Sequence, residues 1–431
     1  MLKGLKIKRR VLSILCFCSR ITFCVVAMVA FLQPVYSQGW KKDIQVGDAL
    51  MSQRRYAEAL ELYNEALYKN PEVKVSNQLV ECYEVLEDWR KLATWTHKSY
   101  RENPSPEGLL KTAQAFKKVG DYERAKVLYR KYLTHSDDAE QAKIEMAGCD
   151  SALKWREDYM GPEPRNYRSI NTAWSETAPV VYDDQLVFVS NREGTLIRSK
   201  NSMNNLPYFD LYAYPFISPK RKKKVAYFDS FLASRSHFGP VAFAPDGKTM
   251  YFTKSKSPKD NDGPSSRPKL YMTTNENGKW QDPLKFVMND SAFVFGHPSI
   301  SEDGKIFLFS SNMPGGFGGL DIYFCIRIDS TWSDPINLGT EVNTAGNEIS
   351  PFLKGKSKLY FASDSHVGMG GFDMFTSVLQ DDGQFSEVQN CGPRLNSSYD
   401  ELSLFENDSY VFFASNRAGG EGKEDIYYLK K

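Results

Sequence analysis

Histidine, cysteine and net charge are all scarce in this sequence. Its 431 residues include five histidines, and three of the seven cysteines fall within the first 24 residues. The remaining four, Cys82, Cys149, Cys325 and Cys391, match no metal-binding spacing. Basic and acidic residues nearly cancel, at 55 against 53, so no charged field indicates a nucleic-acid partner. The sequence predicts neither a metal nor another cofactor.

Catalytic signatures are missing as well. The sequence contains no Gly-x-Ser-x-Gly elbow, Cys/His pair, phosphate-binding loop or dinucleotide fingerprint. Acidic residues do recur in its second half, but they recur at equivalent positions of a repeat. A glycosidase needs two or three acids at distinct positions. We therefore expect a non-enzymatic protein.

The first forty residues have the composition of a targeting segment. MLKGLKIKRR is cationic, ITFCVVAMVAFL at 21–32 is apolar, and Val35 and Ser37 place small residues before a cleavage site. We expect residues 1–37 to be a signal peptide, which would export the chain to the periplasm or the outer membrane. An uncleaved anchor is the alternative, although Arg20 interrupts the apolar run.

If the chain is exported, the four later cysteines could form disulfides or remain free thiols. An oxidising compartment permits disulfides, and the pairs within one domain would be Cys82–Cys149 and Cys325–Cys391. Buried free thiols are the other alternative, since cysteine packs well as a small apolar residue.

Residues 38–160 show the periodicity of helix–turn–helix repeats. Ala59, Leu92 and Ala125 are 33 positions apart each time, close to the roughly 34-residue tetratricopeptide (TPR) repeat. Small residues at such positions let paired helices approach closely. Residues 137–159 have the pattern of an amphipathic capping helix. The segment predicts a short α-solenoid.

Such a solenoid presents a concave face built from the first helix of each pair. We expect six polar residues on it, and interpret them as a candidate surface for binding other envelope proteins: Asp48, Asn77, Glu81, Glu84, Gln114 and Lys117. The alternative is that the helices simply dock on the second domain.

Residues 161–431 repeat with a long period. Asp321, Asp373 and Asp425 lie 52 positions apart, and each follows an apolar-aromatic strand that ends in Ser. A period of this length, filled with short strands, is typical of a propeller blade. Five related units predict a five-bladed β-propeller, and six blades are the alternative if the insert at 192–236 hides another. The fold class is therefore multidomain, α plus all-β.

One repeated phrase predicts how the ring closes. Residues 170–173 (Ile-Asn-Thr-Ala) mirror residues 342–345 (Val-Asn-Thr-Ala), which follow the fourth strand of a unit. The last unit ends at Lys431 after only three strands. We expect the segment near 165–171 to supply its missing outer strand, which would remove an exposed edge.

The repeated acids favour a structural interpretation. Asp321, Asp373 and Asp425 follow Gly-rich loops, where their carboxylates would accept backbone N–H bonds. Three glutamates, Glu176, Glu348 and Glu401, recur just before the inner strands, where they could line one mouth of the channel. Their repetition favours a role in linking the blades over chemistry, and a bound cation or sugar is the alternative.

Two histidines also fall near prolines of adjacent units. His237 and His297 would approach each other around the propeller axis. Two histidines without a third ligand are a weak signal for a metal site.

The blade motifs resemble the TolB-like propeller repeat, of the PD40 and WD40-like kind. Residues 190–192 and 415–417 both read Ser-Asn-Arg, residues 311–312 match this in part with Ser-Asn, and Asp-Ile-Tyr stands at 321–323 and 425–427. Helical repeats followed by this propeller resemble the front half of PorE-type envelope proteins of the type IX secretion apparatus. We expect no counterpart of the OmpA-like domain of those proteins within these 431 residues, so the resemblance does not imply peptidoglycan anchoring.

The resemblance implies a scaffold that binds other proteins, as part of an outer-membrane or type IX secretion complex or as an accessory to one. Membrane association would be indirect, through partners. The alternative function is a propeller that binds glycans or peptidoglycan fragments, or a glycosidase that uses the propeller mouth.

Overall fold

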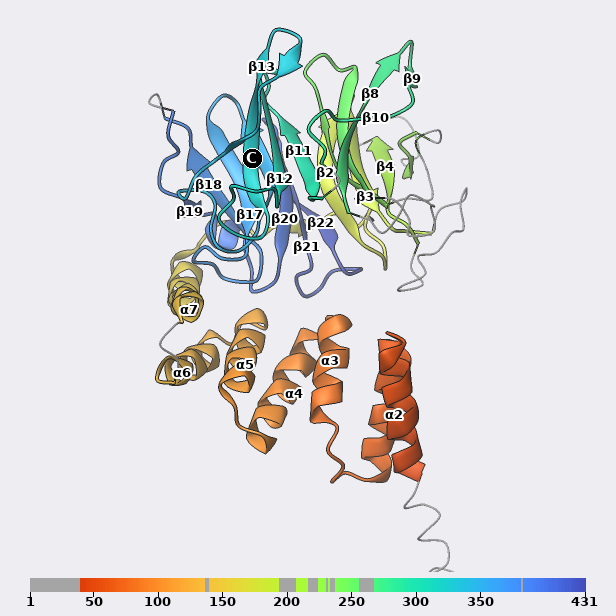
Figure 1. Ribbon diagram of the computed structural model, residues 1–431, viewed down its shortest axis with the longest axis vertical. Helices are drawn as coiled ribbons and strands as arrows, with labels where there is room; N and C mark the ends of the chain where they lie inside the picture. The colour runs from red at the N-terminus through yellow and green to blue at the C-terminus, as the bar shows by residue number, and fades with distance from the viewer. Residues whose placement is uncertain are drawn as a thin grey trace, which may run out of the picture. The chain divides into compact units, whose positions relative to one another are not determined.

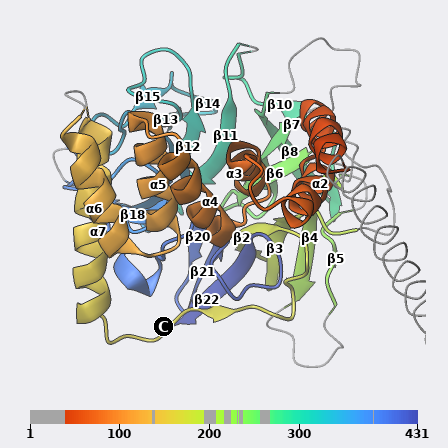
Figure 2. The same cartoon turned by 90° about the horizontal axis from the view of Figure 1, so that it is seen from below.

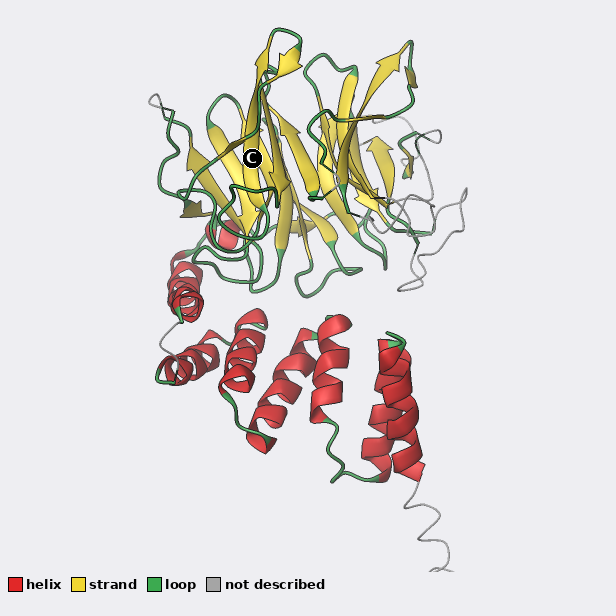
Figure 3. Ribbon diagram, viewed as in Figure 1, coloured by secondary structure: helices red, strands yellow, loops and turns green. Residues whose placement is uncertain are grey.

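The computed structural model describes residues 39–135, 139–193, 207–215, 224–229, 232, 237–255, 267–290, 292–380 and 383–431. The predicted signal peptide lies outside these residues. The chain forms two compact units, which divide between Asn103 and Pro104. The described α-helices all precede the strands in the sequence. Figure 3 draws the helices in red and the strands in yellow. Among the described residues, no helix is long and apolar enough to cross a membrane.

The first unit is helical. A helix over residues 39–52 precedes α2 (Tyr56–Lys69), α3 (Ser76–Val85) and α4 (Trp89–Glu102). Ala59, Tyr63 and Ala66 line the buried side of α2. Gly47 lies so close to the Tyr63 ring that a Cβ there would come within 2.8 Å of it. The absence of a side chain at Gly47 therefore lets the first two helices pack closely.

The second unit begins with three more helices, α5 (Pro106–Lys118), α6 (Tyr122–Leu133) and α7 (Glu140–Asp158). Side-chain caps start the first two, because Ser105 accepts a hydrogen bond from Gly108 N and Asp121 accepts one from Arg124 N. Gly148 of α7 packs against the backbone of Gly368, and α7 lies beside the propeller (Figure 2). These three helices therefore belong to the same compact unit as the sheets.

The strands form five antiparallel sheets, which confirms the five-bladed β-propeller (Figure 1). Blade 1 holds β2 (Glu176–Tyr182), β3 (Gln185–Ser190), β4 (Asp210–Pro215) and β5 (Ala226–Tyr227); blade 2 holds β6 (His237–Phe243), β7 (Thr249–Ser255), β8 (Lys269–Glu276), β9 (Lys279–Trp280) and β10 (Leu284–Lys285). Blade 3 holds β11 (Phe295–Ile300), β12 (Ile306–Ser311), β13 (Asp321–Ile328), β14 (Thr331–Trp332) and β15 (Ile336–Asn337). Blade 4 holds β16 (Glu348–Lys354), β17 (Lys358–Ser363), β18 (Asp373–Val378) and β19 (Gln389–Asn390), and a short 3-10 helix, η1 (Gly392–Arg394), follows it.

Blade 5 joins the two ends of the propeller sequence. It holds β20 (Glu401–Glu406), β21 (Tyr410–Ser415) and β22 (Asp425–Lys430), and its outer strand is β1 (Arg165–Asn166). Arg165 pairs with Tyr428 and Asn166 with Tyr427. The prediction that the segment near 165–171 completes the last blade is confirmed. The insert at 192–236 contributes β4 and β5 to blade 1.

The core of the propeller lies between the blades. Five apolar clusters each join neighbouring blades, and one of them closes the ring by packing Leu186 and Phe188 of blade 1 with Phe412 and Ile426 of blade 5. Aromatic rings fill much of this space, as expected for pleated strands that pack face to face.

The cysteines of the described residues are free thiols. Cys82, Cys149 and Cys325 are buried, and Cys391 is partly exposed. Burial raises the pKa of Cys82 to about 11 and the pKa of each of the other three to about 12. Neither predicted disulfide is formed, and the thiols fit the alternative of buried packing residues.

Candidate functional site

The three repeated aspartates begin the third strands of their blades and are almost fully buried. Asp321 accepts hydrogen bonds from Phe317 N at 2.6 Å and Gly318 N at 3.1 Å. Asp425 accepts equivalent bonds from Glu421 N at 2.6 Å and Gly422 N at 3.1 Å. These carboxylates therefore hold the preceding Gly-rich loops in place.

Asp373 occupies the same position with a weaker set of partners. Its Oδ2 accepts bonds from Met369 N and Gly370 N, while its Oδ1 is buried without a partner among the described residues. Burial, followed by the charge of Glu401, raises the pKa of this carboxyl well above its usual value.

In blade 2 the first residue of the third strand carries a positive charge where blades 3, 4 and 5 have an aspartate. Lys269 starts its third strand, and the Lys269 ammonium donates to the backbone oxygens of Asp290 and Phe293. Burial lowers the pKa of Lys269. A cation that binds carbonyl oxygens thus replaces an anion that binds N–H groups, and the segment it holds lies between β10 and β11 rather than before the third strand.

The three repeated glutamates are interior residues. Glu176, Glu348 and Glu401 are each 0% exposed, so they do not line a mouth of the channel, and their burial agrees with the structural role that their repetition favours. Each is the first residue of an inner strand and pairs with the Ser that ends the second strand. That Ser donates to the glutamate in all three blades, at 2.7 or 2.8 Å.

An arginine completes this arrangement in two of the three blades. Arg192 pairs with Glu176 and Arg417 pairs with Glu401, each at 3.0 Å. The residue two positions after the Ser is Ser365 in blade 4, so Glu348 has no arginine there. Burial raises the pKa of Glu348, and the hydrogen bonds from Ser363 and Thr344 only partly oppose it.

The propeller axis holds a cavity of about 110 Å³ between the five inner strands. Each inner strand has a β-bulge here, and four bulges contain a residue with positive φ followed by Pro or Leu. Pro is tolerated at a bulge because a bulged residue leaves its ladder position unpaired. The bulges turn the residues Ala178, His297, Ser350 and Ser403 toward the axis.

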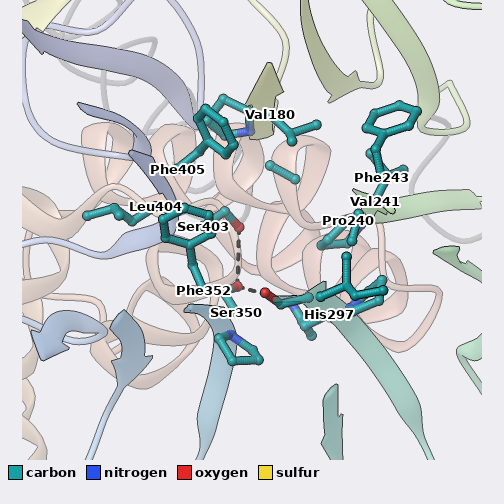
Figure 4. A pocket seen from close by; sticks show the side chains of 17 residues that line it. Val180, Pro240, Val241, Phe243, His297, Ser350, Phe352, Ser403, Leu404 and Phe405 are labelled. Atoms are coloured by element: carbon teal, nitrogen blue, oxygen red, sulfur yellow. Dashed lines mark hydrogen bonds between the residues drawn. The ribbon is translucent and has the colours of Figure 1, made fainter. Parts of the chain in front are cut away.

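Three of these axial residues are polar and in contact (Figure 4). Ser350 Oγ lies 3.0 Å from His297 Nδ1 and 3.2 Å from Ser403 Oγ. Burial lowers the pKa of His297 to about 4, so its imidazole is neutral at physiological pH. The remaining lining is mainly proline, aliphatic and phenylalanine side chains, and none of the lining residues is an acid.

Only one of the two histidines expected near the axis is there. His237 begins β6 and packs against the ring of Tyr208, with ring centroids 4.8 Å apart. The described residues contain no cluster of three or more His, Cys, Asp or Glu arranged to hold a metal ion.

The axial Ser–His contact was not foreseen from the sequence. The signal that would have found it is the residue just before each repeated proline, at Ala178, His297 and Ser350. A Ser–His pair is the start of a nucleophile and base arrangement, but that arrangement also needs a third group to orient the base. The site as built is suited to binding water or a small polar group.

The six polar residues predicted for the concave helical face fall in both units. Asp48, Asn77, Glu81 and Glu84 are exposed residues of the first unit, and Asp48 accepts a hydrogen bond from Tyr63 OH at 2.7 Å. Gln114 and Lys117 belong to α5 in the second unit, where Gln114 is exposed and Lys117 is buried in an ion pair with Glu145.

Comparisons with solved structures show weak similarities, all at low sequence identity. A putative TolB from Agrobacterium tumefaciens is 15% identical, with a TM-score of 0.37 over 62% of this chain and 96% of that one. The arabinanase Arb43A of Bacillus subtilis is 9% identical, with a TM-score of 0.36 over 63% of this chain and 96% of that one. A puromycin-hydrolysing peptidase of Mycobacterium tuberculosis is 13% identical, with a TM-score of 0.34 over 56% of this chain and 35% of that one.

This chain therefore spans about a third of the peptidase. No protein-family model and no curated protein matches the chain. At these identities and TM-scores the structural matches give no basis for assigning a function.

Proposed function

We propose that this chain is an exported, non-enzymatic scaffold of the cell envelope, located in the periplasm or at the outer membrane. In this proposal, TPR-like helical repeats and the loop face of the propeller bind partner proteins. The resemblance to PorE-type proteins favours a component of an outer-membrane or type IX secretion complex, or an accessory to one. Nucleic acid is not a partner, and membrane contact is indirect.

The main support for this proposal is that the repeated acids are buried and hydrogen-bonded within the propeller. Asp321, Asp425, Glu176 and Glu401 all accept hydrogen bonds from within their own blades, and all are buried. A glycosidase needs two carboxylates that flank a sugar in an open site. The residues that line the axial cavity supply none. This supports a protein-binding role over the alternative of a glycosidase at the propeller mouth.

Recovery of partners from the envelope tests the proposal. The tagged full chain would be purified from an envelope extract, and partners identified by mass spectrometry. Glu81 is an exposed residue of α3, and Glu72 is an exposed residue of the loop before α3. We expect Glu81→Lys to lower recovery of a stoichiometric partner about tenfold, because a reversed charge in an interface is costly. Glu72→Lys is the matched control and should bind normally.

Two outcomes would contradict the scaffold proposal. One is that the wild-type chain recovers no stoichiometric partner. The other is hydrolysis of a glycan by the purified protein, which a screen of polysaccharide substrates would detect.

A further inference from the structure

A second cavity in the 104–431 unit has a different character from the axial one. It holds about 370 Å³ and lies between helices α5, α6 and α7 on one side and propeller loops of blades 3 and 4 on the other. We call it the helix–loop cleft; its lining is Gln114, Lys117, Lys118, Tyr129, Gln141, Glu145, Gly346, Asp364, Ser365, Gly370 and Gly371. Its volume falls in the range of small-molecule sites.

The charges of the helix–loop cleft are paired within the protein. Lys117 is bound to Glu145, and Lys118 Nζ lies 3.4 Å from Asp400. Asp364 accepts two bonds from Asn347, through its backbone N–H and its side-chain amide, each at 2.8 Å. A charged ligand would have to compete with these pairs, whereas an uncharged ligand would not.

The cleft nevertheless retains hydrogen-bonding groups that the protein does not use. Tyr129 is 0% exposed, and its hydroxyl has no hydrogen-bond partner among the described residues. A buried hydroxyl without a partner is costly, so a ligand that supplies one gains affinity. The side chains of Gln114 and Gln141 are exposed beside it and offer amide donors and acceptors.

The lining also argues against a peptide anchored by apolar side chains. None of the eleven lining residues is aliphatic, and Tyr129 is the single aromatic among them. Peptide grooves normally provide apolar pockets for alternate or periodic side chains. A sugar differs, because each hydroxyl both donates and accepts and carries no charge.

We propose that the helix–loop cleft binds a small uncharged saccharide. Its hydroxyl groups would bond to Gln114 and Gln141 at the rim and to the Tyr129 hydroxyl at the base, while the ion pairs Lys117–Glu145 and Lys118–Asp400 remain intact. This site is separate from the axial cavity, and sugar binding there goes beyond the scaffold function proposed above.

Binding of defined sugars to the full chain tests this proposal. The probes are glucose, galactose, mannose, N-acetylglucosamine, cellobiose and chitobiose, measured by ligand-observed NMR and calorimetry. We expect saturable binding of at least one of them. Tyr129→Phe and Gln114→Ala should each weaken it about three- to tenfold, the loss expected for one hydrogen bond.

The chain offers a matched control for each variant. Tyr122 lies on the same helix, and its hydroxyl is also buried without a partner, but it does not line the cleft. Gln380 is an exposed glutamine of the propeller outside the cleft. Tyr122→Phe and Gln380→Ala should leave sugar affinity unchanged. Neither Tyr→Phe change should lower the melting temperature of the free protein, since each removes an unsatisfied hydroxyl.

Three results would overturn the proposal. The first is that none of the six sugars binds at concentrations up to about 10 mM. The second is that Tyr129→Phe and Gln114→Ala leave sugar binding unchanged. The third is that the two control variants weaken sugar binding equally. Partner recovery by the Glu81→Lys and Glu72→Lys pair is independent of these results, so a failure here is distinguishable from a failure of the scaffold function.

Discussion

The side-chain oxygen of Asn171 accepts a hydrogen bond from the backbone N–H of Ile426 at 3.0 Å, across 255 positions of the chain. The Asn171 amide also donates to Ile426 O at 2.9 Å. Asn343 binds Ile322 and Asn396 binds Met374 in the same two-bond manner. The junction that closes the ring therefore uses the same contact as the junctions inside the continuous chain.

This equivalence predicts the effect of removing the closing contact. Asn171→Ala leaves the buried N–H of Ile426 without its partner, while Ile426 O keeps the hydrogen bond from Tyr167 N at 2.9 Å, so we expect a loss of about 1–2 kcal/mol in the free energy of unfolding. Urea denaturation measures it, and Asn396→Ala serves as the internal comparison. If Asn396→Ala destabilised the protein and Asn171→Ala did not, the N-terminal segment would not close the propeller.

The buried glutamates predict a contrast between two otherwise identical substitutions. Glu401→Gln removes the anion that faces Arg417, whose side chain is only 14% exposed, and should cost about 3 kcal/mol of stability. Glu348→Gln removes a buried anion at a position without an arginine and should cost less than about 1 kcal/mol or stabilise the protein. Chemical denaturation at neutral pH compares the two. Equal losses would show that the arginine is not what stabilises the glutamate.

The raised pKa of Glu348 predicts a dependence of stability on pH. In the folded protein this carboxyl keeps its proton at pH values above 4.5, the ordinary pKa of a glutamate side chain. Between that pH and the raised pKa, the folded state therefore binds more protons than the unfolded state. The free energy of unfolding contributed by this group therefore falls as pH rises through the folded-state pKa. The stability of Glu348→Gln relative to wild type should increase over the same window. A difference that is constant with pH would contradict the pKa shift.

The axial histidine predicts a titration that NMR can follow. Burial lowers the pKa of His297 from 6.5 to about 4, so its ring signals should move near pH 4. The unfolded state takes up the proton at higher pH than the folded state, so the contribution of His297 to stability is lost as pH falls from 6.5 toward 4. An inflection near pH 6.5 would mean that water reaches the axial cavity freely.

The sequence predicted the five-bladed ring and its closure because the blade motif is repeated along the chain. The matching phrases at Asn171 and Asn343, with a last unit one strand short, were enough to place β1 in blade 5. The repeated aspartates were likewise interpretable, since an acid after a Gly-rich loop has backbone N–H groups within reach.

What the sequence could not give depends on register and on tertiary packing. His237 stands three positions before its proline and His297 stands immediately before its own, so the β-bulge turns only His297 to the axis. A channel mouth was one possible place for Glu176, but strand pairing with Ser190 puts it in the interior. The helix–loop cleft combines residues from α5 to α7 with loops more than two hundred positions away, which no local pattern indicates.

The central claim is that the repeated acids hold the blades together and perform no chemistry. Its most direct test is the free energy of unfolding of Asp425→Asn, because an amide nitrogen in place of one carboxylate oxygen faces the N–H donors of Glu421 and Gly422. We predict a loss of about 2 kcal/mol, with partner recovery unchanged at temperatures where the variant stays folded. A variant of unchanged stability that loses partner binding or a hydrolytic activity would contradict the claim.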